Sequence, residues 1–249
     1  MKLKRILVSM MAVAMTVSIV PTLVFADKIE NDADETAIIE VADTKAENPA
    51  KFKSGSMIPT SGTCGKNLKW NVDGNGSLVI SGSGAMNSYK AGGAPWYALK
   101  DKITSLAFSG SPTSIGNYAF YNLDITSVYI RATIKTVGTG AFYNCKSLTK
   151  VTGGNALTSI GTAAFKQCSS LSSFTINSKK LSKIGSNAFS GASSLKKINI
   201  AKTTKLTKKG VKKSLANSSV TTVNVKNNKK VVYKYYFSKS NSGKKVSVK

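Results

Sequence analysis

Hydrophobic residues recur at a regular spacing between residues 103 and 225. The pattern is apolar-x-x-apolar-x-apolar, and the first residues of successive copies are 22, 23, 23, 24 and 25 positions apart. The alternation of its last three positions predicts a short strand with one buried face in each copy. The copies are Ile103/Leu106/Phe108, Ile125/Val128/Ile130, Leu148/Val151/Gly153, Leu171/Phe174/Ile176, Leu195/Ile198/Ile200 and Val220/Val223/Val225, where Gly153 departs from the pattern.

A second pattern runs in phase with the first. Ile-Gly-x-x-Ala-Phe occurs at 115–120, 160–165 and 184–189, with Val in place of Ile at 137–142. We expect the glycine to allow a tight turn or a positive φ, and the phenylalanine to fill the core against its counterpart one coil away. The predicted core ladder consists of Gly116, Gly138, Gly161, Gly185, Phe120, Phe142, Phe165 and Phe189.

Two patterns held in phase over six periods predict a solenoid, in which each unit is stable only when stacked on its neighbours. The expected fold is a β-rich repeat solenoid over residues 101–226, with about six short parallel strands and short turns or helical turns opposite them. We interpret the unit at 205–215, which lacks Ala-Phe, as a terminal cap that faces water.

Distinct segments flank the repeats. "NLKWNV" and "SLVISG", joined by "DGNG", predict an N-terminal β-hairpin capping module over residues 61–100. Trp70 and Trp96 are expected to pack there rather than to bind sugars. Residues 227–249 form a basic C-terminal cap or tail, in which "VVYKYYF" and "KVSVK" predict a hairpin, with a mobile tail as the alternative.

The N-terminal residues predict export. Residues 1–26 combine a basic start, an apolar run and small residues at Val24 and Ala26, as in a cleaved secretory signal peptide. A membrane anchor is the alternative, but the apolar run is shorter than the ~20 residues of a spanning helix. Residues 27–60 are expected to be an acidic disordered leader or a propeptide, with eight acids and two lysines between 27 and 50. We therefore expect a secreted or cell-surface protein without a membrane span.

The rest of the chain is strongly basic. The whole chain carries +25, and residues 51–249 contain only three acids, Asp73, Asp101 and Asp124. Sixteen lysines and no acid follow from Lys196 onward. This positive electrostatic field favours a polyanionic polysaccharide, a wall polymer or an acidic protein as partner. Nucleic acid is not expected in the compartment of an exported protein. The alternative explanation of the positive charge is that it keeps the protein soluble and its copies apart. We expect a monomer.

Residues for catalysis are scarce. The chain has no histidine, and residues 51–249 have no glutamate, which removes nucleophile–histidine pairs and paired carboxylates. We therefore expect no enzyme activity, no metal and no cofactor; the alternative is an enzyme with a serine–lysine pair, although the abundance of both residues singles out no particular pair. Three cysteines fit no disulfide framework. Cys145 and Cys168 occupy the same place in neighbouring repeats and are expected to be buried thiols, with a bridge between coils as the alternative.

The outward positions of the predicted strands are candidates for binding. Solenoids commonly bind along such a surface, whereas a solvated sheet face without a ligand is the alternative. The candidate residues are Ser127, Tyr129, Lys150, Thr152, Ser173, Thr175, Lys197 and Asn199, flanked by Ser105, Ala107, Thr222 and Asn224.

Two copies carry a family resemblance. "VGTGAFYNCKSLTKV" and "IGTAAFKQCSSLSSFTI" resemble the leucine-rich repeat of the BspA-like type, common in exported bacterial proteins. "SGTCGKNLKWNVDGNGSLVISGSGAM" followed by "APWY" is similar to the segment that often precedes such repeats. The resemblance implies a leucine-rich repeat fold and a non-catalytic role in adhesion or contact with host proteins. The alternative is a wall-associated scaffold held by its lysine-rich end.

Overall fold

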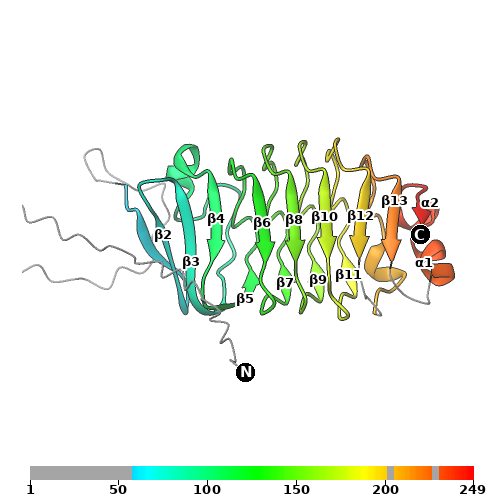
Figure 1. Cartoon of the computed structure of the whole chain (residues 1–249), viewed down its shortest axis with the longest axis horizontal. Helices are drawn as coiled ribbons and strands as arrows, with labels where there is room; N and C mark the ends of the chain where they lie inside the picture. The colour runs from blue at the N-terminus through cyan, green and yellow to red at the C-terminus, as the bar shows by residue number, and fades with distance from the viewer. Residues whose placement is uncertain (1–57, 201–204, 226–229) are drawn as a thin grey trace, which may run out of the picture. The chain divides into compact units, whose positions relative to one another are not determined.

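The computed structural model describes residues 58–200, 205–225 and 230–249. The predicted signal peptide and nearly all of the predicted acidic leader lie outside the described residues. The repeats form stacked coils, each with one longer strand and, in most coils, a second short strand, joined by turns (Figure 1). The expectation of a repeat solenoid with short parallel strands is thereby confirmed.

Parallel strands from successive coils build two sheets. A six-stranded sheet has the order β14-β13-β12-β10-β8-β6, and an eight-stranded sheet has the order β1 (Ser61–Gly65), β2 (Asn67–Val72), β3 (Ser77–Ala85), β5, β7, β9, β11, with β4 beside β3. The first strand of each coil has four residues, in β4 (Ser105–Phe108), β6 (Ser127–Ile130), β8 (Lys150–Gly153), β10 (Ser173–Ile176), β12 (Lys197–Ile200) and β13 (Thr222–Val225). The remaining strands are β5 (Ser111–Ile115), with five residues, and the two-residue strands β7 (Thr136–Val137), β9 (Ser159–Ile160), β11 (Lys183–Ile184) and β14 (Ser247–Val248).

The phenylalanines of the second pattern stack through the middle of the coils. Phe120, Phe142, Phe165 and Phe189 are fully buried. Their ring centroids are 5.2, 5.3 and 5.9 Å apart in sequence order, with interplanar angles of 24°, 4° and 8°. Trp96 extends this stack at its N-terminal end, 5.7 Å from Phe120, and its indole nitrogen donates to the carbonyl of Ala119.

Three antiparallel strands precede the repeats. They are β1 (Ser61–Gly65), β2 (Asn67–Val72) and β3 (Ser77–Ala85). The hairpin between β2 and β3 is closed by Asp73, whose carboxylate accepts from the backbone N–H groups of Asn75 and Ser77. Trp70 is buried edge-on against Trp96, so neither indole ring has an exposed face on which a sugar could stack.

The first strand of the repeats does not join the others. We expected all the longer strands to form one sheet, but β4 pairs in parallel with β3, and the six-stranded sheet begins at β6. The guanidinium group of Arg131 donates to the carbonyl of Phe108 across the break. Along the other side of the coils, β5 and β7 remain paired. β4 therefore extends the sheet of the N-terminal hairpin, because four residues of β3 pair with it.

The expected positive φ at the motif glycines is wrong. Gly116, Gly138, Gly161 and Gly185 all lie outside the left-handed region. That conformation occurs two residues later in each coil, at Tyr118, Gly140, Ala163 and Asn187. The glycines are needed for another reason: a Cβ atom at Gly161 would lie 2.5 Å from the carbonyl carbon of Gly138 in the preceding coil. Backbone approach between coils, rather than turn geometry, therefore requires glycine here.

The predicted C-terminal hairpin is also wrong. Residues Lys230–Tyr236 form helix α1, Lys239–Ser242 form helix α2, and β14 pairs in parallel with β13. Tyr233 and Phe237 are buried and lie four positions apart, which is one turn of a helix. The unit at 205–215 is not the last coil, because the backbone N–H groups of Lys213 and Leu215 donate to the backbone carbonyls of Asn241 and Ser242 in the coil that follows.

Candidate functional site

The candidate binding residues lie together on the exposed face of the six-stranded sheet. In each strand the apolar partners point inward: Val128, Val151, Phe174 and Ile198 are buried. Parallel pairing brings Lys150 beside Ser127 and Ser173, and Lys197 beside Thr222. We call this surface the outward strip; it comprises Ser127, Tyr129, Lys150, Thr152, Ser173, Thr175, Lys197 and Asn199, all exposed or half-buried.

Hydrogen bonds order one end of the outward strip. The amide of Asn199 donates to the hydroxyl of Thr175 at 3.2 Å, and the amide of Asn224 donates to Asn199 at 2.9 Å. At the other end Tyr129 is 61% exposed. The strip is therefore a row of polar groups with one exposed aromatic ring, and it can bind another molecule by hydrogen bonds and packing.

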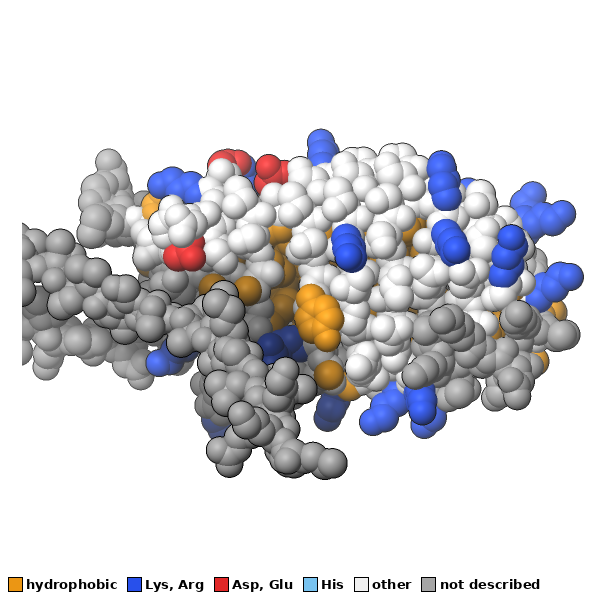
Figure 2. All heavy atoms as spheres, viewed as in Figure 1, with side chains coloured by type: hydrophobic (Ala, Val, Ile, Leu, Met, Phe, Trp, Pro, Cys, Tyr) orange, Lys and Arg blue, Asp and Glu red, His pale blue; other side chains and the backbone are white. Residues whose placement is uncertain are grey.

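Charge is distributed unevenly over the coils. Acidic side chains lie toward the N-terminal end of the described part, whereas lysines dominate toward the C-terminal end (Figure 2). Within the described ranges the one ion pair joins Lys100 to Asp101. Lys150 and Lys197 thus have no carboxylate partner among these residues and remain available to an anionic partner.

The cysteines are buried thiols. Cys64, Cys145 and Cys168 are free, and the thiols of Cys145 and Cys168 each donate to a phenylalanine carbonyl of the preceding coil, at 3.0 Å. Burial raises the pKa of the Cys64 thiol and of the Cys145 thiol to about 12. Burial likewise raises the pKa of Cys168 well above its ordinary value. These thiols therefore lack the thiolate character of reactive cysteines.

We expect none of the three thiols to react with 5,5′-dithiobis(2-nitrobenzoate) at about pH 8 in the folded protein, since thiolate is the reacting species. All three should react at once in guanidinium chloride, which serves as the control.

Burial raises the pKa of the Cys145 thiol from the ordinary value of 9.0 to about 12 in the folded chain. Its contribution to stability is therefore intact below pH 9 and declines as the pH rises toward 12. Rapid labelling of the folded chain would contradict the burial.

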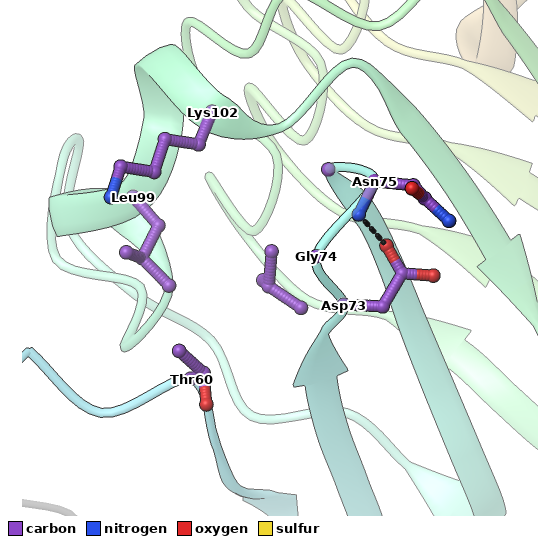
Figure 3. A pocket seen from close by; sticks show the side chains of 8 residues that line it. Thr60, Asp73, Gly74, Asn75, Leu99 and Lys102 are labelled. Atoms are coloured by element: carbon purple, nitrogen blue, oxygen red, sulfur yellow. Dashed lines mark hydrogen bonds between the residues drawn. The ribbon is translucent and has the colours of Figure 1, made fainter.

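A hollow lies next to the N-terminal hairpin. It has a volume of about 590 Å³ and lies between the β2–β3 turn and the 3-10 helix η2 (Tyr97–Lys102). Figure 3 shows the carboxylate of Asp73 bonded within its own turn, while Leu99 and Lys102 lie across the hollow. Among the described residues no group of three or more His, Cys, Asp or Glu side chains is placed to hold a metal ion.

A row of tyrosines was not predicted from the sequence. Tyr97 precedes the first coil, and Tyr121 and Tyr143 each follow Ala-Phe in successive coils. Their ring centroids are 6.0 and 5.6 Å apart, and all three rings are half-buried. We call these residues the tyrosine row. The signal that points to it is the string "AFYN", present at 119–122 and again at 141–144.

One solved structure of a bacterial protein shares the fold, and another was matched at a lower TM-score. A leucine-rich repeat protein from Eubacterium ventriosum is 27% identical, with a TM-score of 0.54 over 69% of this chain and 46% of its own. A leucine-rich cell surface protein from Faecalibacterium prausnitzii is 17% identical, with a TM-score of 0.27 over 68% of this chain and 55% of its own. The chain thus spans about half the length of these proteins.

No curated protein matches the chain. In the part that the structure describes, no helix has the length and hydrophobicity needed to cross a lipid bilayer. The BspA type leucine-rich repeat region matches residues 100–244 in six copies. This range contains the stacked phenylalanines and every strand of the six-stranded sheet except β14. The chain therefore belongs to the BspA type leucine-rich repeat family.

Proposed function

We propose that this chain is an exported, non-catalytic binding protein that contacts another protein at or outside the cell surface through the outward strip, and that the contact is adhesive. Proteins of its family are generally surface proteins that take part in protein interaction. The observation that carries the proposal is the strip itself, where four parallel strands in register present polar side chains to solvent. Multiple weak contacts along such a surface add up when it is rigid.

Lysine attraction supports the same role. Lys150 and Lys197 lie two strands apart on the strip and are exposed. An acidic partner would be steered toward them, and this attraction weakens as salt is added. We propose a monomer as the binding form.

A second candidate function is a wall-associated scaffold held on an anionic polymer by the lysine-rich end. The absence of acids after Asp124 favours it. Several lysines of the last coil, among them Lys234, Lys239 and Lys245, are exposed. Because Tyr233 and Phe237 are buried in that coil, removing it would also disturb the core, so substitutions test this function better than truncation.

One experiment separates the two functions. Lys150→Ser with Lys197→Ser changes the outward strip to the residue that Ser127 and Ser173 already present there. Lys239→Ser with Lys245→Ser removes the same charge from the last coil. We expect the strip variant to bind an acidic extracellular protein at least about tenfold more weakly, while retention on anionic cell walls declines only in the second variant. Equal loss of protein binding in both variants would contradict a role of the strip.

A further inference from the structure

The tyrosine row is a fixed surface rather than a set of mobile side chains. Tyr118 packs edge-on against Tyr121, with ring centroids 6.3 Å apart. The ring of Tyr118 also lies over Gly140, where a Cβ atom would come within 2.3 Å of a ring carbon. At the end of the row the ammonium group of Lys166 lies 5.4 Å from the ring centroid of Tyr143. Such packing holds the rings in place before any ligand arrives, which lowers the entropic cost of binding.

The hydroxyl groups of the row are available. Among the described residues no hydrogen bond involves the hydroxyl of Tyr97, Tyr121 or Tyr143. The three rings therefore combine an apolar body with an unused polar tip, a combination that suits a ligand with both apolar and hydroxyl surfaces.

A polar pocket is lined by residues that directly follow two members of the row in the sequence. It has a volume of about 250 Å³, and its polar lining consists of Lys100, Asp101, Asn122, Asp124, Asn144 and Lys146. Asn122 and Asn144 directly follow Tyr121 and Tyr143, and the amide of Asn144 donates to that of Asn122 at 2.5 Å. Both asparagines have a left-handed backbone, with φ of 56° and 64°, which fixes where their side chains project.

The charge of this pocket differs from that of the remaining repeats. Its lining holds two lysines and two aspartates, so its formal charge is zero. The two carboxylates are two of only three in residues 51–249, and no acid occurs from residue 125 to the end. A locally balanced charge gives a polyanion no attraction, and it favours an uncharged ligand.

We propose that the tyrosine row and the polar pocket form a binding site for a neutral glycan chain. A pyranose ring presents an apolar C–H face, which packs on an aromatic ring, and a rim of hydroxyls. Asparagine side chains accept from and donate to such hydroxyls, and aspartate carboxylates accept from them. The ring centroids are 6.0 and 5.6 Å apart with interplanar angles of 34° and 64°, so the row presents ring faces and ring edges in turn. A protein partner would instead call for a larger apolar contact core.

The proposal does not depend on the proposed function of the outward strip. Tyr97 begins the 3-10 helix η2, and Tyr121 and Tyr143 lie in turn segments of the coils, whereas the strip belongs to the six-stranded sheet. The two surfaces also respond differently to salt, because lysine-driven binding weakens as salt is added and stacking of a neutral sugar does not.

The test is co-sedimentation of the full chain with insoluble chitin, cellulose, mannan and β-1,3-glucan, at about 0.15 M and about 1 M NaCl. We expect binding to at least one of these polysaccharides at both salt concentrations. Tyr121→Ser should weaken that binding at least about tenfold, and Tyr143→Ser should act in the same direction. Serine is structurally acceptable at this position, since Ser190 occupies it in a later coil. Thermal melting verifies that both variants fold.

The matched control is Tyr129→Ser, which removes an exposed tyrosine from the outward strip and should leave polysaccharide binding unchanged. The proposal would be overturned if the chain bound none of the four polysaccharides. It would also be overturned if binding disappeared at high salt, or if it fell equally in the Tyr121 and Tyr129 variants. Loss of protein binding in strip variants, with polysaccharide binding intact, would support two separate sites.

Discussion

Replacing Phe165 with alanine is expected to lower the free energy of unfolding by about 3–5 kcal/mol. The side chain is fully buried and stacks between Phe142 at 5.3 Å and Phe189 at 5.9 Å. Phe174 packs edge-on against the same ring, 5.3 Å away. The cavity cannot close by local relaxation, because the ladders of backbone hydrogen bonds hold the flanking coils at a set distance. Guanidinium denaturation gives the change directly.

The control for this truncation is Tyr129→Ala. Tyr129 is also aromatic, but it is 61% exposed on the sheet, so its removal should change stability by only about 0.5 kcal/mol. A loss below about 1 kcal/mol for Phe165→Ala would mean that the stacked rings do not carry the core.

Gly161→Val is expected to be at least as damaging, with a loss of about 3 kcal/mol or more. A Cβ atom there would lie 2.5 Å from the carbonyl carbon of Gly138 and 2.5 Å from the backbone nitrogen of Thr139. Backbone atoms cannot rotate away as a side chain can, so the neighbouring coils would have to move apart. The same denaturation experiment measures the effect.

Two further variants identify the cause. Gly161→Ala should already be destabilising, since the clash begins at Cβ. Gly74→Ala should be nearly neutral, because nothing lies within 4 Å of a Cβ at Gly74 in the hairpin turn. If Gly161→Ala were tolerated as well as Gly74→Ala, close approach of the coils would not be the reason for the glycine.

The sequence predicted the coil interior well, because the information is local and repeated. Each strand alternates inward and outward residues, as Lys150, Val151 and Thr152 do, and the structure buries only the valine of these three. Six copies of one pattern reinforce one another, so an irregular position such as Gly153 does not obscure the period. The placement of the outward strip follows directly from that alternation.

Features that depend on other coils were not predictable in this way. The role of Gly161 is set by backbone atoms 22 and 23 positions earlier in the chain. Residues 231–237 were predicted as a strand, whereas the structure buries Tyr233 and Phe237, four positions apart, on one face of a helical segment. The tyrosine row appears only when the N-terminal module and two coils are stacked, since its members are 24 and 22 positions apart.

Because β4 pairs with β3 and not with β6, the contacts between successive coils are not uniform along the solenoid. Between the coils of β6 and β8 both sides are joined, by β6–β8 and by β7–β9. Between the coils of β4 and β6 these two strands are not paired; the coils are joined by β5–β7, by turn bonds, by side-chain bonds from Arg131 and Thr133, and by the stacking of Phe120 on Phe142. In a one-dimensional array cooperativity is limited by the weakest coupling. We therefore expect unfolding to separate the coils first at this junction, between the first coil and the coils from β6 onward.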